Sequence, residues 1–131
     1  MDKEELKGRT KQFALRVIRL VEALPRGKTA DVLGRQLLRS VTSVGANYRA
    51  ACRAKSTADF IAKMGIVEEE TDETVYWMEL LVEAGITKAE LLEGLMKEVM
   101  KLWRSPLLPL LLPGNASNFN PGLPSQIRNQ K

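Results

Sequence analysis

Carboxylates are concentrated in one stretch of the sequence. The run Glu-Glu-Glu-Thr-Asp-Glu occupies residues 68–73, and Glu79 and Glu83 follow it. At helical spacing Glu79 and Glu83, like Glu69 and Glu73, fall on one face, as a carboxylate pair for acid and base catalysis would require. The sequence has no Gly-rich phosphate loop and no nucleophile motif to accompany them. We therefore expect no catalytic residue and no enzymatic activity.

Metal binding is the second chemistry that clustered carboxylates suggest. Carboxylate bundles combine Glu from facing helices with Glu-x-x-His pairs, whereas this sequence has no His and a single Cys. The usual zinc ligand sets and His-based triads cannot be built from one such chain. We expect no metal and no cofactor.

A buried polar layer is the expectation that remains for the acidic run. Six consecutive residues cover every direction around a helix, so at least one of Glu70, Asp72 and Glu73 must face a neighbouring helix. A buried carboxylate needs a partner, and Asn47, Arg49 and Arg53 of the preceding helix are at the right depth to supply it. The predicted buried polar layer consists of Ser40, Asn47, Glu70, Asp72, Glu73 and Thr74.

Arginines recur at helical spacing in the first half of the chain. They form a ridge on the first predicted helix and a stripe on the second, opposite its apolar side. The residues are Arg9, Arg16 and Arg19, then Arg35, Arg39, Arg49 and Arg53. Such rows bind nucleic-acid phosphates with little sequence preference. The alternative is that they pair with acidic residues of the same or an adjacent subunit, and both can hold together.

The charges are strongly polarised along the chain. Residues 1–55 carry thirteen Lys and Arg against five acids, whereas residues 56–85 carry one Lys against eight acids. A basic segment beside an acidic one favours self-association as well as nucleic-acid binding.

Two apolar seams define the helices that position these groups. Their residues alternate at steps of four and three, which is one face of a helix. The seams are Leu33, Leu37, Ser40, Val44, Asn47, Ala51 and Ala54, then Phe60, Met64, Val67, Thr71, Thr74, Met78 and Leu81. The break near residues 54–56 is short, so the two helices must pack antiparallel.

Two further helices complete the predicted fold. The first spans about 3–24 and the last runs from a Thr87 cap to about 104, with Glu90 completing a capping box. Thr29 is a plausible cap for the second helix and Ser56 or Thr57 for the third, which Ala84 and Gly85 end. The fold class is all-α, an antiparallel up-down four-helix bundle over residues 1–105.

Residues 106–131 form a Pro-rich segment that cannot continue a helix. We expect an extended tail whose leucines contact a neighbouring subunit, because its Leu-Leu-Pro-Leu-Leu-Leu-Pro run is more apolar than a disordered linker. The predicted assembly residues are Leu107, Leu108, Leu110, Leu111 and Leu112.

Two blocks carry a family resemblance: SVTSVGANYRAACRAKSTADF and EEETDETVYWMELL. The chain resembles, over roughly residues 10–104, the four-helix bundle proteins of large-subunit ribosomal RNA intervening sequences. The resemblance implies a small up-down bundle that assembles as a homopentamer and has no established enzymatic activity. It departs from the family at Ala50, where Glu is usual, and at Thr71, where Ala is frequent, so a Glu-dependent role is not carried over to position 50.

Two function hypotheses follow. The first is a nucleic-acid-associated accessory protein that binds RNA or DNA, in keeping with the family's occurrence in ribosomal RNA gene insertions. The second is a structural assembly or protein-partner adaptor. The start of the chain lacks an apolar run typical of a signal peptide, and no stretch reaches the ~20 apolar residues of a membrane span, so we expect no membrane partner and a cytoplasmic location.

Overall fold

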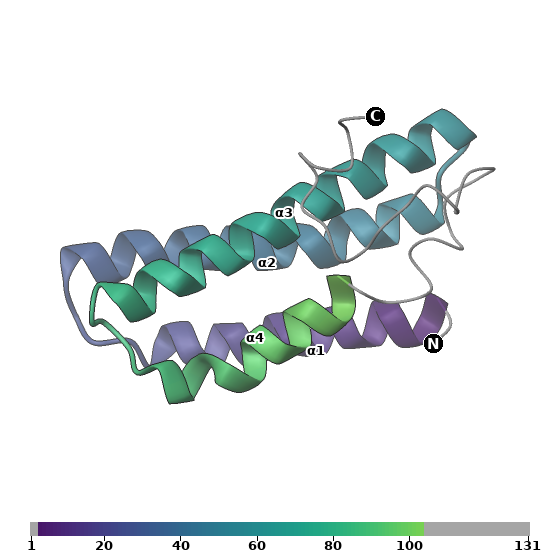
Figure 1. Ribbon diagram of the computed structural model, residues 1–131. Coiled ribbons are helices and arrows are strands. Elements are labelled where there is room, and N and C mark those ends of the chain that lie inside the picture. The colour runs from purple at the N-terminus through teal and green to yellow at the C-terminus, as the bar shows by residue number, and fades with distance from the viewer. Residues whose placement is uncertain (1–2, 104–131) are drawn as a thin grey trace, which may run out of the picture.

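The computed structural model describes the backbone of residues 3–103 and the side chains of residues 3–102. This part of the chain forms four α-helices, α1 (Lys3–Glu22), α2 (Lys28–Cys52), α3 (Thr57–Glu83) and α4 (Ala89–Trp103), and contains no strand (Figure 1). The all-α four-helix fold predicted from the sequence is confirmed.

The α2–α3 hairpin is the centre of the bundle. Its two helices have 25 and 27 residues and run antiparallel along most of the molecule (Figure 1). The predicted seams are largely the buried faces, with Leu37, Met78 and Leu81 fully buried between the helices. Burying such side chains contributes about 1.5–3 kcal/mol each, so the hairpin supplies much of the core.

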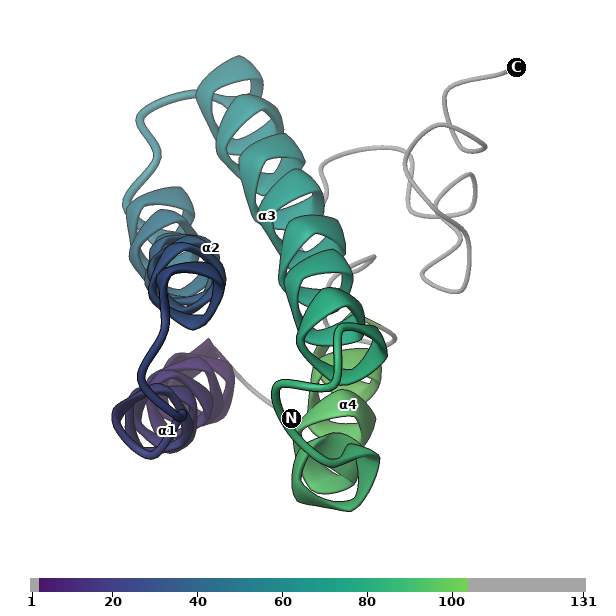
Figure 2. The same ribbon diagram turned by 90° about the vertical axis from the view of Figure 1, so that its left-hand side faces the viewer.

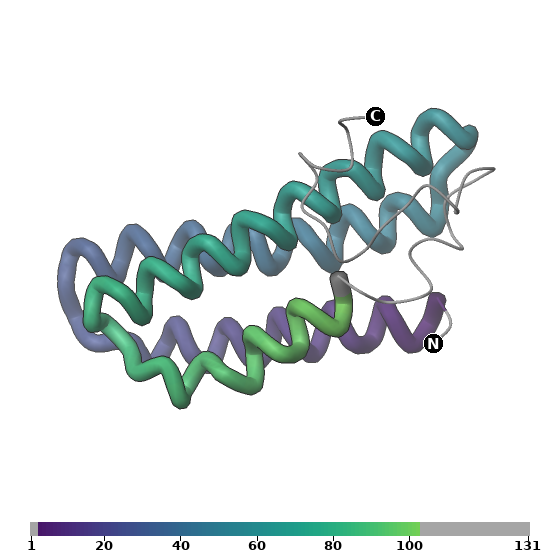
Figure 3. The backbone as a smooth tube through the Cα atoms, viewed as in Figure 1, coloured from purple at the N-terminus to yellow at the C-terminus, as the bar shows by residue number. Residues whose placement is uncertain are grey.

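Helices α1 and α4 cover the rest of the core. Helix α1 packs on α2, and α4 packs on both α3 and α1; viewed end-on, α1 lies beneath α2 and α4 beneath α3 (Figure 2). Helix α4 has only 15 residues, so the hairpin extends well beyond its end (Figure 3). The N-terminal half of α3 therefore has no α4 beside it.

One glycine explains the close approach of α1 and α2. Gly34 is buried, and a Cβ built on it would lie 3.1 Å from Cγ1 of Val21 and 3.4 Å from Cδ1 of Leu24. A larger residue would push the helices apart. Gly45, by contrast, has only Thr10 nearby, at an ordinary contact distance of 3.7 Å.

The helix ends follow the sequence signals in part. Ser56 caps α3 and accepts a hydrogen bond from the Asp59 amide, as predicted, and Gly85 leaves the helix at φ 74°, a conformation that favours glycine. Thr29 lies inside α2, whose N-cap is Gly27. Thr87 lies two residues before the start of α4 at Ala89.

Some predictions fall on other parts of the chain. The predicted tail, residues 106–131 with its five assembly leucines, lies outside the described residues. Among the helices that the structure describes, none is both long enough and apolar enough to cross a membrane.

Candidate nucleic-acid interface

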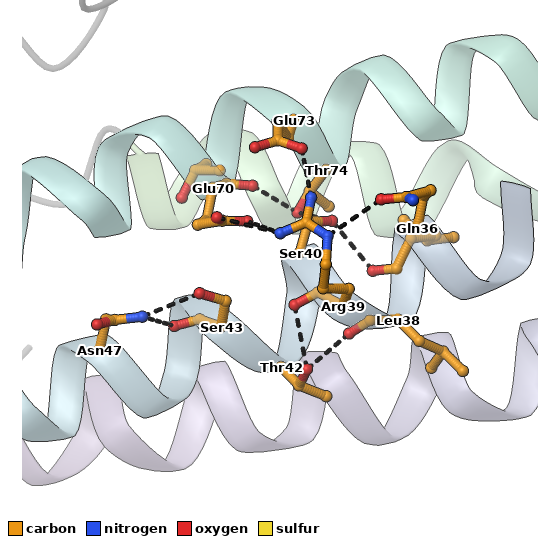
Figure 4. Close-up of polar contacts among 12 residues, drawn as sticks. Gln36, Leu38, Arg39, Ser40, Thr42, Ser43, Asn47, Glu70, Glu73 and Thr74 are labelled. Carbon is orange, nitrogen blue, oxygen red and sulfur yellow. Dashed lines mark hydrogen bonds and ion pairs between the residues drawn. The ribbon is translucent and has the colours of Figure 1, made fainter.

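Arg39 is the centre of an ion-pair cluster between α2 and α3 (Figure 4). Its Nη1 donates to both carboxylate oxygens of Glu70, at 3.0 and 3.2 Å, and its Nη2 donates to Glu73. Its Nε donates to the side-chain oxygen of Gln36 at 3.0 Å. The planar guanidinium thus uses its three nitrogens on three partners, which orients it along the surface of the hairpin.

The cluster lies at the edge of the core rather than inside it. The Glu70 side chain is 14% exposed, whereas Arg39 and Glu73 are 46% and 42% exposed. Burial works against the charge of Arg39, but the two carboxylates outweigh it and raise its pKa above its ordinary value. Arg39 therefore stays charged and is already neutralised within the chain.

Two hydroxyl groups form the buried polar contact beneath this cluster. Thr74 Oγ1 lies 3.0 Å from Ser40 Oγ and 2.8 Å from the Glu70 carbonyl, and Ser40 Oγ donates to the Leu37 carbonyl at 3.1 Å. Ser40 and Thr74 are both fully buried. They supply a direct side-chain hydrogen bond between α2 and α3.

The other members of the predicted polar layer lie elsewhere. Asn47 donates to Ser43 of its own helix, to both the backbone and the side-chain oxygen at 2.9 Å, and Asp72 is partly buried. Arg53 is the exposed C-cap of α2. The partner of Glu70 and Glu73 is Arg39, a residue that the sequence placed on the basic stripe, and not Asn47, Arg49 or Arg53.

Arg9 makes a second ion pair, between α1 and α4. Its Nη2 lies 2.7 Å and its Nε 3.1 Å from the two carboxylate oxygens of Glu98, a two-pronged contact. The hydrogen bonds that Arg9 donates to Glu98 outweigh the effect of burial and raise the pKa of Arg9 above its ordinary value. Like Arg39, Arg9 is used to hold two helices together.

The other five predicted arginines are exposed and form no ion pair with a described side chain. They are Arg16, Arg19, Arg35, Arg49 and Arg53. Arg35 and Arg49 of α2 and Arg53 at its C-cap lie opposite the buried side of the helix and are spread over about 27 Å, at 1.5 Å per residue. The only acid on α2 is Asp31, one turn before Arg35, and Arg49 lines a hollow with Glu4, Glu5 and Glu98, so these guanidinium groups face solvent without an ion pair among the described side chains but with acids nearby.

Lysines of α1 add to this surface and were missed in the sequence. A shallow hollow beside Gly8 is lined by both signs of charge: the cations are Lys7, Arg9, Lys11 and Arg49, and the carboxylates are Glu4, Glu5 and Glu98. Lys7 pairs with Glu4 at 3.1 Å. The four-residue spacing of Lys7 and Lys11 could have placed them on one side of the helix, but only the packing of α1 on α2 brings them toward Arg49.

Acidic residues do not gather into a metal site in this structure. Within residues 3–102, no group of three or more His, Cys, Asp or Glu is arranged to hold a metal ion. The arrangement offers ion pairs, a buried hydroxyl contact and a cationic outer surface on α1 and α2.

Comparison with known proteins places this fold in a family. Residues 3–105 match the model of the 23S rRNA-intervening sequence protein family. The chain is also 35% identical to a solved structure from Bacteroides thetaiotaomicron VPI-5482, described as a protein with unknown function from the S23 ribosomal protein family. The TM-score is 0.72, and the similarity covers 83% of this chain and 99% of that one. No curated protein matches the chain.

The family match spans all four helices and most of the chain, and it agrees with the resemblance seen in the two sequence blocks. The protein belongs to the 23S rRNA-intervening sequence protein family.

Proposed function

We propose that this protein is a non-enzymatic, oligomeric helical-bundle protein that binds the phosphate backbone of nucleic acids through the exposed arginines of α1 and α2. The observation that carries the proposal is the division among the seven predicted arginines. Arg9 and Arg39 are used in ion pairs between helices, whereas the other five are exposed and have no carboxylate partner among the described side chains.

Binding of this kind depends on the charge of the nucleic-acid backbone and not on the base sequence. Tyr48 is buried, so it is not available for stacking on bases, and the outward side of α2 carries no aromatic residue. Guanidinium groups on a helix surface contact phosphate oxygens, which carry no sequence information. We expect affinity that falls steeply with salt and varies little between sequences.

Assembly would multiply this surface. The basic helices α1 and α2 and the acidic helix α3 lie on one small bundle, so copies can associate through complementary charges, and we favour a homopentamer. A ring would repeat the arginine surface around its axis and increase the electrostatic attraction for a polyanion. The family description refers to 23S rRNA, so RNA is the first nucleic acid to test.

The test is a filter-binding series with RNA, single-stranded DNA and duplex DNA of several sequences, each at several salt concentrations. The mass of the protein is measured by light scattering under the same conditions. We expect a stable oligomer and a linear fall of log affinity with log salt, at similar affinities for unrelated sequences. Absence of binding at low salt would refute nucleic-acid binding, and a stable monomer at micromolar concentration would refute assembly.

A second candidate function is a structural assembly or protein-partner adaptor. The Arg39 cluster favours it, because it is an example of an α2 arginine paired with α3 carboxylates. Exposed Arg35 or Arg49 would make the same contact with Glu69 or Glu79 of an adjacent copy. In that case substitution of Arg35 and Arg49 would weaken the oligomer, and the intact protein would bind no nucleic acid.

A further inference from the structure

An aromatic pair lies on the solvent-facing part of α3. Tyr76 is 51% exposed, and its ring meets that of Trp77 edge to face, with centroids 5.0 Å apart at 64°. The indole Nε1–H of Trp77 is shielded from solvent and has no acceptor among the described residues. Because that N–H is shielded, the feature that an occupant could meet is the exposed Tyr76 ring, which favours an occupant that brings apolar contact.

The surroundings of this pair are acidic. Four carboxylates lie three or seven residues from Tyr76, and thus on its side of α3, together with the partly buried Leu80. They are Glu69, Glu79 and Glu83, together with Glu73, which also pairs with Arg39. After Lys63, the rest of α3 carries no Lys or Arg. Such an anionic rim repels nucleic acid and favours an apolar segment that carries positive charge or none.

The chain itself contains a segment with these properties. Residues 106–113 read Pro-Leu-Leu-Pro-Leu-Leu-Leu-Pro, and residues 104–131 carry Arg104, Arg128 and Lys131 without any acid. Pro-rich segments favour an extended helix whose carbonyls are free of internal hydrogen bonds, and aromatic side chains are their usual receptors. The segment thus matches this surface in apolar character and in charge.

Residues 106–113 are close enough along the chain to reach the Tyr76–Trp77 surface of their own chain. Helix α4 ends at Trp103, beneath the middle of α3 (Figures 1 and 2). Leu107 follows four residues later, so the connection spans up to about 14 Å, compared with about 10–12 Å for the diameter of a helix. The next six residues cover about 19 Å at 3.1 Å each, enough to cross α3 to its outward side.

We propose that residues 106–113 dock on the Tyr76–Trp77 surface of their own chain. The proposal does not depend on nucleic-acid binding. Trp77 packs beside Tyr76, so its indole signal reports on a segment docked over the Tyr76 ring.

The experiment uses the full chain with a single nitroxide label at Leu110→Cys, in a Cys52→Ser background, and observes ¹⁵N-labelled protein by NMR. We expect loss of the Trp77 indole signal and of amide signals from residues 69–80, with signals on α1 unaffected. Trp77→Phe identifies the indole signal. A label at Gln12→Cys, which is exposed on α1, is the matched control and should leave the Trp77 signal sharp.

Two further samples separate the alternatives. Tyr76→Ala, which removes an exposed ring and leaves the helix content measured by circular dichroism unchanged, should restore the signals that the Leu110 label abolishes. Mixing ¹⁵N-labelled protein without nitroxide with an excess of unlabelled, nitroxide-bearing protein should leave the signals sharp. Loss of signal in that mixture as well would place the segment on a neighbouring copy and overturn the proposal. The proposal is also overturned if the Leu110 label leaves the Trp77 indole and the amides of residues 69–80 unchanged. This holds whether or not the indole signal then shifts when single-stranded RNA is added.

Discussion

The hydrogen bond between Ser40 and Thr74 is expected to couple α2 to α3 energetically. The two oxygens are 3.0 Å apart and both side chains are fully buried. Ser40→Ala or Thr74→Val leaves the other hydroxyl in the core, although Ser40 keeps the Leu37 carbonyl and Thr74 the Glu70 carbonyl as partners. We therefore expect each single substitution to cost about 1–2 kcal/mol, near the range for a buried hydrogen bond with partial compensation.

The double variant shows whether the two hydroxyl groups interact or are only buried near each other. With both hydroxyls removed nothing is left unsatisfied, so Ser40→Ala/Thr74→Val should cost about 0.5–1.5 kcal/mol less than the sum of the two single variants. Urea unfolding at one fixed protein concentration measures this coupling and keeps any contribution from assembly constant. Additive costs, within about 0.3 kcal/mol, would mean that the two hydroxyls do not interact and would refute the assigned contact.

Three further predictions concern local features of the helices. Gly34→Ala should destabilise the folded protein by about 1–2 kcal/mol, because its Cβ would lie 3.1 Å from a valine methyl of α1. Gly8→Ala is the control: no atom lies within 4 Å of its Cβ, so it should stabilise the folded protein by about 0.5–1 kcal/mol in thermal unfolding. Ser56→Ala should cost about 1 kcal/mol in the same assay through loss of the α3 cap, and an unchanged midpoint would show that the cap contributes nothing. The hydrogen bond from Lys63 holds the pKa of Asp59 below its ordinary 3.8. As the pH falls, Asp59 is therefore protonated in the unfolded chain before it is protonated in the folded one. The stability that ionised Asp59 contributes is present above about pH 4 and is lost as the pH falls through the lowered pKa. Asp59→Asn should therefore reduce the acid sensitivity of urea unfolding between pH 2 and 5, and an identical pH profile would contradict it.

The fold was predictable because several local signals agree. The two apolar seams have the same helical periodicity, and the break between them is too short for a crossover connection. The two helices can therefore pack only as an antiparallel hairpin. Of the two predicted caps of α3, Ser56 and Thr57, Ser56 is the one observed, and the predicted stop at Ala84 and Gly85 is confirmed, since each signal depends on neighbouring residues alone. The prediction of Thr29 as the cap of α2 was wrong, because the N-cap is Gly27. A difference of two residues in the position of a helix end lies within the precision of such signals.

The partners of the charged residues were not predictable to the same degree. Spacing placed Arg39 on one stripe with Arg35 and Arg49, but Arg39 is about 40° from Arg35 and about 80° from Arg49 around the helix, which turns Arg39 toward α3 and the others away from it. The pairing of Arg9 with Glu98 likewise depends on the placement of α4 against α1, which periodicity does not define. The sequence identifies which groups carry charge, and packing decides which of them remain available for a ligand.

The most direct test of phosphate binding compares two double variants with the same change in formal charge. Arg35→Gln/Arg49→Gln removes two exposed arginines, whereas Arg9→Gln/Arg39→Gln removes two that are already paired. Each phosphate contact contributes about 0.9 to the slope of log affinity against log salt on duplex DNA and about 0.7 on single strands. We predict that the first variant flattens the slope by about 1.8 units per engaged subunit on duplex DNA and that the second leaves it nearly unchanged. Equal slopes for the two variants would contradict the division of the arginines on which the proposed function depends.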